Sequence, residues 1–374
     1  MTQGRIRILM TSPSYPEGID DWRSVFIRQM VTALAARTEV ELSLWAPEGP
    51  VPERVRLAAT TKEKQWLQDL SRQGGIASAL RRNPILGAWT GLTLARHLHR
   101  AYKRYNSVDL IHANWLQLAI PLPRDSKQPL LVTALGTDLS LLKLPGMVSL
   151  LRNRFASRRT ALCPNSEWME SQLRRHFGDV AIVRSVPFGI DSSYYSLDRR
   201  PRPGPHKWIC VSRVTPGKIG HLFDWGAEAF KSPERELHLI GPMQGKVDIP
   251  AWVKYHGAAS QRELITRWFP EATGLISLST HPEGRPQVML EALASGIPII
   301  ASDLPAHRDV LSEPASGAIC RSRAQLPGLL SYLESWQSSE ERREATKSYA
   351  ARCFGTWEDS AARYLEIYRE LINQ

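Results

Sequence analysis

The stretch that decides the fold is His281-Pro-Glu-Gly-Arg-Pro-Gln-Val-Met-Leu-Glu-Ala-Leu-Ala-Ser-Gly-Ile-Pro298. Pro286 suits the first position of a helix, because its missing N–H is one that the helix cannot use. Gly296 and Pro298 suit the positions that follow a helix end. The pattern predicts a helix over 286–294, which is entered from a glycine-containing loop and leads into a strand over 299–301.

Short β-rich runs alternate with helical stretches on both sides of this segment. We predict strands over 6–10, 40–44, 109–112, 130–134, 208–211, 237–240, 253–255 and 274–277, and helices over 22–36, 219–230 and 357–372. This alternation is typical of parallel sheets with helices on both faces. The sequence therefore predicts an α/β fold.

The chain has 374 residues, enough for two domains with separate cores. The Pro- and Gly-rich stretch DRRPRPGPHK at 198–207 is tolerated neither by a helix nor by a central strand. We therefore predict a first domain over 1–195, a linker over 196–207, a second domain over 208–355 and a terminal helical segment over 356–374.

The net charge of +11 arises in the first half, where residues 1–190 hold 26 Lys and Arg against 15 Asp and Glu. No acid lies between Asp69 and Asp109. That segment contains Arg72, Arg81, Arg82, Arg96, Arg100, Lys103 and Arg104, interleaved with Ile85, Leu86, Trp89 and Leu92. Residues 72–104 thus suit an anionic membrane surface or a phosphate-bearing acceptor, or else form a solvated basic helix face. A nucleic-acid partner is not expected, because no recognised binding module is present.

Targeting and metal-binding signals are not evident. The apolar run at 6–10 is too short for a signal peptide, and about 18 consecutive apolar residues, as a membrane span requires, occur nowhere. The four cysteines are scattered without metal-ligand spacing. These features predict a cytoplasmic protein with no metal site.

The loop before the 286–294 helix has the character of a diphosphate site, because the free N–H groups of residues 285–288 and the helix dipole attract anions. Glu283 and Glu291, in the context EGRPQVMLEALASGIPIIAS, resemble the signature of glycosyltransferase family 4. Its members are retaining enzymes with the GT-B fold, two Rossmann-like domains that face each other across a cleft. The resemblance implies that Glu283 faces the donor sugar and Glu291 holds the ribose hydroxyls. The donor would also lie against Gly284, Arg285, Pro286, Gln287 and Val288.

A second motif agrees with this resemblance. Arg213 and Lys218, after the predicted strand 208–211, resemble the family's Arg-x4-Lys diphosphate clamp. Two fixed cations would stabilise the departing nucleoside diphosphate, so no metal or other cofactor is expected beside the nucleotide-sugar co-substrate.

Smaller matches extend the resemblance over nearly the whole chain. They include residues 187–191, the glycine turn with Gly241, and the strand with Tyr255 and His256, which would present backbone to the nucleobase. The terminal helix resembles one that crosses back onto the first domain. The resemblance thus implies an acceptor-binding first domain and a nucleotide-sugar-binding second domain, with the site beyond the carboxyl ends of the strands.

The first domain carries three further candidates. Gly18 lies in a loop where a phosphate could approach closely, and His112, at a strand end, would touch the acceptor. Leu135 stands where the family has a histidine near the 6-hydroxyl of the donor sugar. An apolar side chain there predicts a 6-deoxyhexose or pentose donor; another sugar orientation, a water molecule or a weakly active protein are the alternatives.

The predicted function is transfer of a sugar from a nucleoside diphosphate to an acceptor hydroxyl, with retained anomeric configuration. The departing phosphate would accept the proton of the acceptor. The basic segment suggests a lipid-linked or lipopolysaccharide-type acceptor, and hence surface polysaccharide assembly at the inner face of the cytoplasmic membrane. A non-catalytic nucleotide-sugar-binding protein and a nucleotide-sugar epimerase are the alternatives.

Overall fold

A computed structural model describes residues 4–200 and 203–373. The side chains of Ala77, Arg81, Thr137 and Asp138 are not among the described parts, so the predicted contribution of Arg81 to the basic segment lies outside them. The chain divides into two compact units. The first unit is Met1–Pro187 with Trp357–Gln374, and the second unit is Phe188–Thr356.

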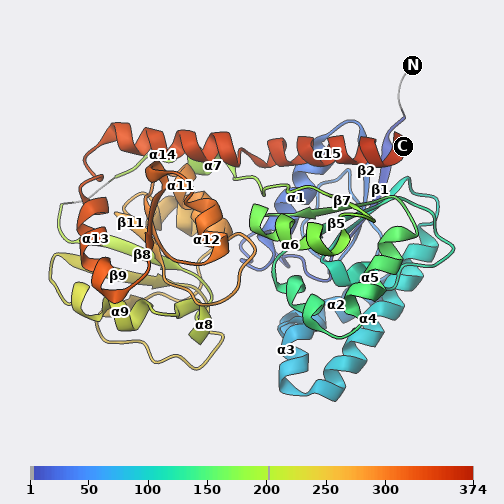
Figure 1. Ribbon diagram of the computed structural model, residues 1–374, viewed down its shortest axis with the longest axis horizontal. Helices are drawn as coiled ribbons and strands as arrows, with labels where there is room; N and C mark the ends of the chain where they lie inside the picture. Colours follow the sequence, from blue (N-terminus) through green and yellow to red (C-terminus); the bar gives the residue numbers. More distant parts are fainter. Residues whose placement is uncertain (1–3, 201–202, 374) are drawn as a thin grey trace. The chain divides into compact units, whose positions relative to one another are not determined.

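The first unit contains a seven-stranded sheet, of which Figure 1 labels β1, β2, β5 and β7. The strand order of the sheet is β3-β2-β1-β4-β5-β6-β7. Its strands are β1 (Ile6–Thr11), β2 (Val40–Trp45), β3 (Arg56–Leu57), β4 (Leu110–Asn114), β5 (Leu130–Ala134), β6 (Thr160–Pro164) and β7 (Ile182–Val183). All pairings are parallel. The central strands β4, β5 and β6 are buried along their whole length, which is why their sequences lack the alternation of half-exposed strands.

Helices cover this sheet: α1 (Val25–Ala36), α2 (Thr61–Arg72), α3 (Gly75–Arg82), α4 (Pro84–Arg104), α5 (Met147–Ala156), α6 (Glu167–Phe177) and α15 (Trp357–Asn373). Helix α1 begins three residues later than predicted. The carboxylate of Asp21 accepts the backbone N–H of Glu17 and of Arg23, and Ser24 has a left-handed φ of 51°. The left-handed φ of Ser24 excludes a helix that starts at residue 22, and the hydrogen bonds to Asp21 order the loop before α1.

The second unit contains a six-stranded parallel sheet in the order β10-β9-β8-β11-β12-β13. The strands are β8 (His206–Val211), β9 (Arg235–Ile240), β10 (Val253–Tyr255), β11 (Gly274–Ser277), β12 (Ile299–Ser302) and β13 (Gly317–Cys320). The helices are α7 (Ser192–Tyr195), α8 (Pro216–Ile219), α9 (Leu222–Ala229), α10 (Gln261–Glu263), α11 (Gln287–Ala294), α12 (Pro305–Val310), α13 (Leu326–Glu334) and α14 (Glu340–Cys353). The prediction of α/β units with parallel sheets is confirmed.

Two helices of the second unit differ from their predictions. The helix expected over 219–230 begins only at Leu222, as α9, because Gly220 adopts a φ of 54° and separates it from the short helix α8. Pro286 precedes α11 with an extended ψ of 115° instead of forming its first turn. Gly296 follows α11 in the left-handed conformation that its position predicts, with a φ of 67°.

The boundary between the units lies earlier than the sequence suggested. Ile190, Tyr194 and Leu197 are buried in the core of the second unit, and β8 begins at His206. The predicted linker over 196–207 and the predicted domain end at 195 are therefore incorrect. Proline and glycine do interrupt regular structure here, but apolar side chains that precede them attach the segment to the second core.

Helix α15 is part of the first unit. It buries the face with Trp357, Ala361, Tyr364, Leu365 and Tyr368, which lie at helical spacing. None of the helices in the described ranges is long and apolar enough to cross a membrane.

Candidate active site

The second unit joins two loops at the carboxyl ends of its central strands. The loops are 212–218 after β8 and 278–286 after β11, and these strands are neighbours where the strand order reverses, the position at which such sheets bind ligands. The carbonyl of Gly217 accepts the backbone N–H of Thr280 at 2.8 Å and that of His281 at 3.1 Å. Sequence motifs that are more than 60 residues apart are thereby held together.

Lys218 and Glu283 form an ion pair across the two loops, with 2.6 Å between Nζ and Oε2. Their side chains are only 15% and 9% exposed, so the pair is largely shielded from water. Burial lowers the pKa of Lys218, and the nearby charge of Arg213 adds to this effect, while Glu283 opposes it. Two cations and one carboxylate, all predicted as catalytic, thus meet in one place.

Arg213 differs from Lys218 in its exposure. Arg213 is exposed, and no carboxylate of the described chain lies within ion-pair distance of its guanidinium. A guanidinium in this state is available for a planar, bidentate contact with a phosphate group.

His307 of α12 is a neighbour of this pair that the sequence analysis missed. It is fully buried, and its Nδ1 lies 3.0 Å from the carbonyl oxygen of Ser302. Burial lowers its pKa, and the charges of Glu283 and Lys218 act on it in opposite directions. The imidazole is therefore neutral and donates from Nδ1. The one sequence feature that could have indicated this residue is its position shortly after the predicted strand 299–301.

The loop before α11 directs two of its side chains toward other parts of the second unit. Gly284 is buried, and the buried guanidinium of Arg285 lies 3.8 Å from Asp309 and 5.2 Å from the ring centre of Phe354. The amide nitrogen of Gln287 donates to the carbonyl of Gly189 at 2.8 Å. The side chains of Arg285 and Gln287 thus contact other parts of the second unit, while the predicted donor contacts concern the backbone N–H groups of this loop and stay a prediction. The first-turn N–H groups of α11, from Gln287 and Val288, remain suited to an anion.

Glu291 is the carboxyl residue of α11, and it is half-buried. Burial raises its pKa from 4.5 to about 7; the hydroxyl of Tyr194 opposes the rise and the charge of Asp191 adds to it. The carboxyl group is consequently half-protonated near neutral pH, and it can either accept hydrogen bonds or donate one.

A third loop region lies at the same edge of the sheet. It consists of the turn after β9 and the turn after β10. Gly241 has a φ of 145°, its N–H donates to Gly257 at 2.6 Å, and its carbonyl accepts the Tyr255 hydroxyl at 3.0 Å. The ring of His256 lies 4.4 Å from that of Trp268, and burial together with nearby cationic side chains lowers the pKa of His256 to about 4. The predicted residues of this loop therefore lie together, in a rigid turn with a neutral imidazole.

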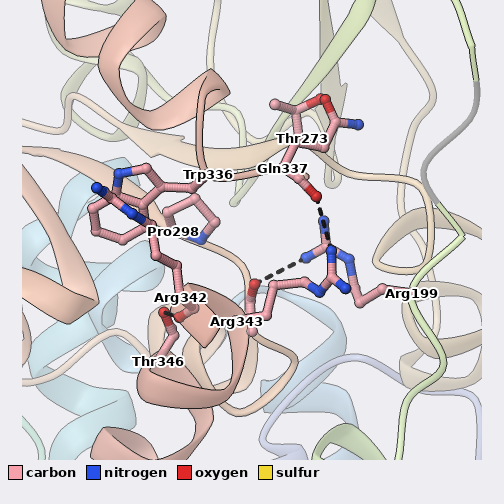
Figure 2. A pocket seen from close by; sticks show the side chains of 9 residues that line it. Arg199, Thr273, Pro298, Trp336, Gln337, Arg342, Arg343 and Thr346 are labelled. Atoms are coloured by element: carbon pink, nitrogen blue, oxygen red, sulfur yellow. Dashed lines mark hydrogen bonds between the residues drawn. The ribbon is translucent and has the colours of Figure 1, made fainter. Parts of the chain in front are cut away.

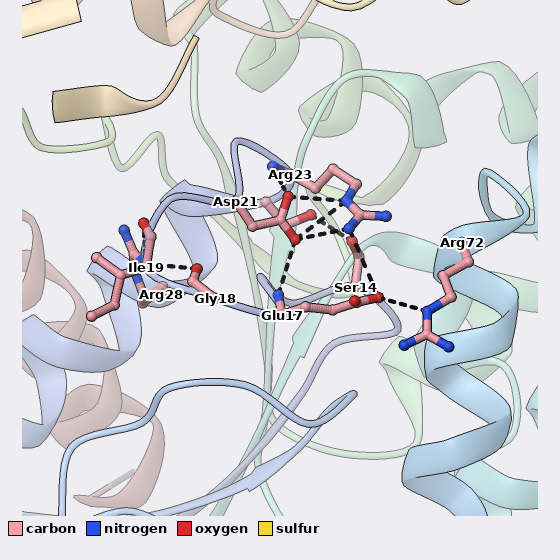
Figure 3. A network of polar contacts seen from close by, with 9 residues as sticks. Ser14, Glu17, Gly18, Ile19, Asp21, Arg23, Arg28 and Arg72 are labelled. Carbon is pink, nitrogen blue, oxygen red and sulfur yellow. Dashed lines mark hydrogen bonds and ion pairs between the residues drawn. The ribbon is translucent and has the colours of Figure 1, made fainter. Parts of the chain in front are cut away.

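Gly18 lies in a loop of the first unit that a polar network orders (Figure 3). The carboxylate of Asp21 accepts hydrogen bonds from Arg23, and Nη1 of Arg28 donates to the carbonyl oxygens of Gly18 and Ile19 at 3.2 and 2.9 Å. No atom of the described chain lies within 4 Å of the place that a Cβ on Gly18 would take. The loop is fixed, and it leaves room beside Gly18.

The other two candidates of the first unit have different surroundings. His112 is fully buried, with Nδ1 2.7 Å from the hydroxyl of Tyr368 and Nε2 2.7 Å from the hydroxyl of Thr133. Both ring nitrogens are thus used inside the unit, so the prediction that His112 touches the acceptor is wrong; it ties β4 and β5 to α15. Leu135 is half-buried in the turn after β5.

Gly220 and Gly217 provide a test of how closely the two loops must approach. A Cβ at Gly220 would lie 2.2 Å from the carbonyl oxygen of Leu278, whereas one at Gly217 would meet nothing closer than 3.5 Å. We expect Gly220→Ala to reduce the free energy of unfolding by roughly 2 to 4 kcal/mol, because overpacking adds to backbone strain. Gly217→Ala is the matched control and should change it by less than about 0.5 kcal/mol. Urea unfolding measures both; equal stability of the two variants would contradict the close approach.

Within the described ranges, no three or more His, Cys, Asp or Glu residues are grouped so that they could hold a metal ion.

Known proteins resemble the chain in part of its sequence and in its whole fold. Residues 243–352 match the family model described as Glycosyl transferases group 1. Sucrose-phosphate synthase from Thermosynechococcus elongatus has a TM-score of 0.72 and 17% identity over 99% of this chain and 100% of that one. Anabaena HepE in complex with UDP has a TM-score of 0.67 and 14% identity over 98% and 100%. The lipopolysaccharide outer core galactosyltransferase WaaB has a TM-score of 0.58 and 14% identity over 97% and 99%.

No curated protein sequence matches the chain significantly. The family match includes Tyr255, His256, Glu283 and Glu291, while Arg213 and Lys218 precede it. The matches confirm the prediction of the GT-B fold, and the region at residues 243–352 confirms the prediction of a glycosyltransferase.

Proposed function

We propose that the protein is a retaining transferase of family 4, which moves a sugar from a nucleoside diphosphate to an acceptor hydroxyl. The observation that carries this proposal is the meeting of Lys218, Arg213 and Glu283 at the carboxyl ends of β8 and β11. The position is that of ligands in doubly wound sheets, and the charges suit a leaving diphosphate.

The chemistry follows from these charges. Lys218 and Arg213 would neutralise the diphosphate as the bond to the sugar breaks, without a metal or another cofactor. Glu283, released from Lys218 by the phosphates, would stabilise positive charge that develops at the anomeric carbon. The departing phosphate oxygen would take the acceptor proton on the same face, which retains the anomeric configuration.

The nucleotide is the first part of this proposal to test. Because Anabaena HepE was solved with UDP, we expect a uridine nucleotide to bind best. Calorimetry with UDP, GDP, ADP and dTDP under identical conditions identifies the base. If none of the four binds even at millimolar concentration, the assignment of the donor site fails.

The identity of the sugar depends on Leu135. An apolar side chain cannot pair with a 6-hydroxyl, and an unpaired buried hydroxyl costs about 1 to 3 kcal/mol. We therefore expect a 6-deoxyhexose or pentose donor to be used about 10-fold more efficiently than the corresponding hexose. Relative kcat/KM for a UDP-hexose and its 6-deoxy analogue tests this expectation, and preference for the 6-hydroxylated sugar contradicts it.

The acceptor proposal rests on the hairpin of α3 and α4. At its tip Ile85, Leu86 and Trp89 are 72%, 63% and 59% exposed, a cluster of large apolar side chains on one surface. Arg82 is exposed beside this tip, and Arg96, Arg100 and Lys103 are exposed further along α4, whereas Arg72 and Arg104 are paired with Glu17 and Glu63. We propose that this hairpin contacts the inner face of the cytoplasmic membrane and that the acceptor is lipid-linked or of lipopolysaccharide type, as the name of WaaB also suggests.

Vesicle sedimentation tests the membrane contact. Ile85→Ser combined with Trp89→Ser should weaken binding to vesicles with phosphatidylglycerol by at least about 10-fold, because burial of each side chain contributes about 1.5 to 3 kcal/mol. Leu144→Ser, at another exposed apolar residue of the first unit, is the control and should bind like the native protein. Unchanged binding of the double variant would contradict the contact.

A further inference from the structure

A small cavity lies in the second unit at the amino-terminal edge of its sheet, opposite the edge that carries the active-site loops. Thr273 before β11 and Pro298 before β12 line it, together with arginines from two chain-distant segments (Figure 2). Its volume is about 10 Å³, which is about the space of one water molecule. None of the 9 residues that line it in the described chain is an Asp or Glu.

The cavity contains two guanidinium groups of like charge. Arg199 donates from Nη1 to the carbonyl of Gly296 at 3.2 Å and from Nη2 to the carbonyl of Ala272. Its Nε is buried and has no hydrogen-bond partner among the described residues. Arg343 of α14 points toward Arg199 and donates from Nη1 to the carbonyl of Gln337 at 2.8 Å (Figure 2).

Arg342 is the third arginine of the lining, but its guanidinium is used elsewhere. It stacks over the ring of Trp336, with 4.8 Å between the guanidinium carbon and the ring centre. Burial and the charge of Arg343 lower the pKa of Arg199 to about 10, so Arg199 remains charged at neutral pH. Both arginines are half-buried, and two half-buried cations that face each other without a carboxylate repel unless an anion lies between them.

We propose that this cavity binds one chloride ion, held by Arg199 and Arg343. A chloride ion is only slightly larger than water and accepts hydrogen bonds from several donors, including the unpaired Nε of Arg199. Phosphate and sulfate have four oxygen atoms and do not fit in the volume available. A water molecule fits, but it does not offset two positive charges.

The bound chloride would fasten two segments to the second unit. Arg199 belongs to the segment that enters this unit, and Arg343 to α14 near the end of it. Gly296 keeps α14 close, because a Cβ there would lie 3.2 Å from the carbonyl oxygen of Arg343. The site is thus a structural anion site, and it is independent of the proposed transfer reaction.

Chloride-35 NMR on the native protein tests the proposal directly. We expect excess line broadening that saturates with chloride concentration and disappears in Arg343→Gln. The Arg342→Gln variant is the matched control, because its guanidinium faces Trp336, and it should retain the broadening. Absence of protein-dependent broadening, or equal broadening in Arg343→Gln and the native protein, would overturn the proposal.

Thermal unfolding gives a second readout that does not depend on exchange rates. At constant ionic strength, replacement of gluconate by chloride at ten times its dissociation constant should raise Tm by about 3 to 5 °C. The same replacement should leave Tm of Arg343→Gln unchanged, and sulfate should not substitute for chloride. Equal shifts in the native protein and in this variant would show a general salt effect and would also overturn the proposal.

Discussion

Lys218→Ala is expected to lower kcat/KM for sugar transfer by about 10²- to 10³-fold, the usual consequence of losing one preorganised charge that stabilises a leaving group. The Lys218 side chain is 15% exposed in its pair with Glu283, and after donor binding its ammonium group would face the diphosphate instead. Nucleotide affinity should fall by at least about 10-fold, because the diphosphate is bound in the ground state as well.

The matched control for this variant is Lys231→Ala. Lys231 is an exposed lysine of the same unit, paired with Glu228 three residues earlier. Exposed pairs of this kind contribute little, so kinetics and nucleotide affinity should be unchanged. Steady-state kinetics and calorimetry on both variants give the result. A loss of less than about threefold in Lys218→Ala would remove this residue from the catalytic machinery.

Glu291→Gln is expected to change the pH dependence of stability. The folded protein raises the pKa of this carboxyl group from 4.5 to about 7, so between these pH values the folded state binds more protons than the unfolded state. Stability contributed by the neutral carboxyl group is present below pH 4.5 and is lost as the pH rises to about 7. The loss amounts to roughly 3 kcal/mol, which Gln at this position does not incur.

Urea unfolding of the native protein and the variant from pH 4.5 to 8.5 measures this difference. The variant should gain stability relative to the native protein as the pH rises, while other titrating groups cancel between the two. Parallel curves would contradict the proton-binding state of Glu291. If the ribose hydroxyls donate to the carboxylate, nucleotide binding to the native protein should also tighten as the pH rises through about 7, and binding to the variant should not.

Local sequence patterns were sufficient to predict which segments form helices or strands and to find the motifs. The buried strands, the end of α11 at Gly296, and the spacing of Arg213 and Lys218 depend on interactions within a few residues. The parallel order of the strands follows from the alternation with helices. For this reason the sequence alone predicts the α/β architecture and singles out Arg213 and Lys218.

Burial, in contrast, depends on segments that are far apart in the sequence. His112 ended a predicted strand in the manner of a site residue, but a tyrosine 256 residues later occupies its Nδ1. Arg285 and Gln287 lie in the predicted anion loop, yet Asp309 and Gly189 engage their side chains. No local pattern encodes such partners, because each partner is supplied by the packing of another element.

Some properties of this protein depend on residues that are close in the sequence, and others depend on residues that are far apart in it. Apolar periodicity and turn residues are properties of neighbouring residues, and they predicted the α/β units. The motif with Arg213 and Lys218 predicts a diphosphate clamp by its resemblance to the family. The pairing of Lys218 with Glu283, the raised pKa of Glu291, the neutral His307 and the end of the first unit at Pro187 required the folded chain. Desolvation and charge coupling act through space, and they exist only once distant segments have packed together.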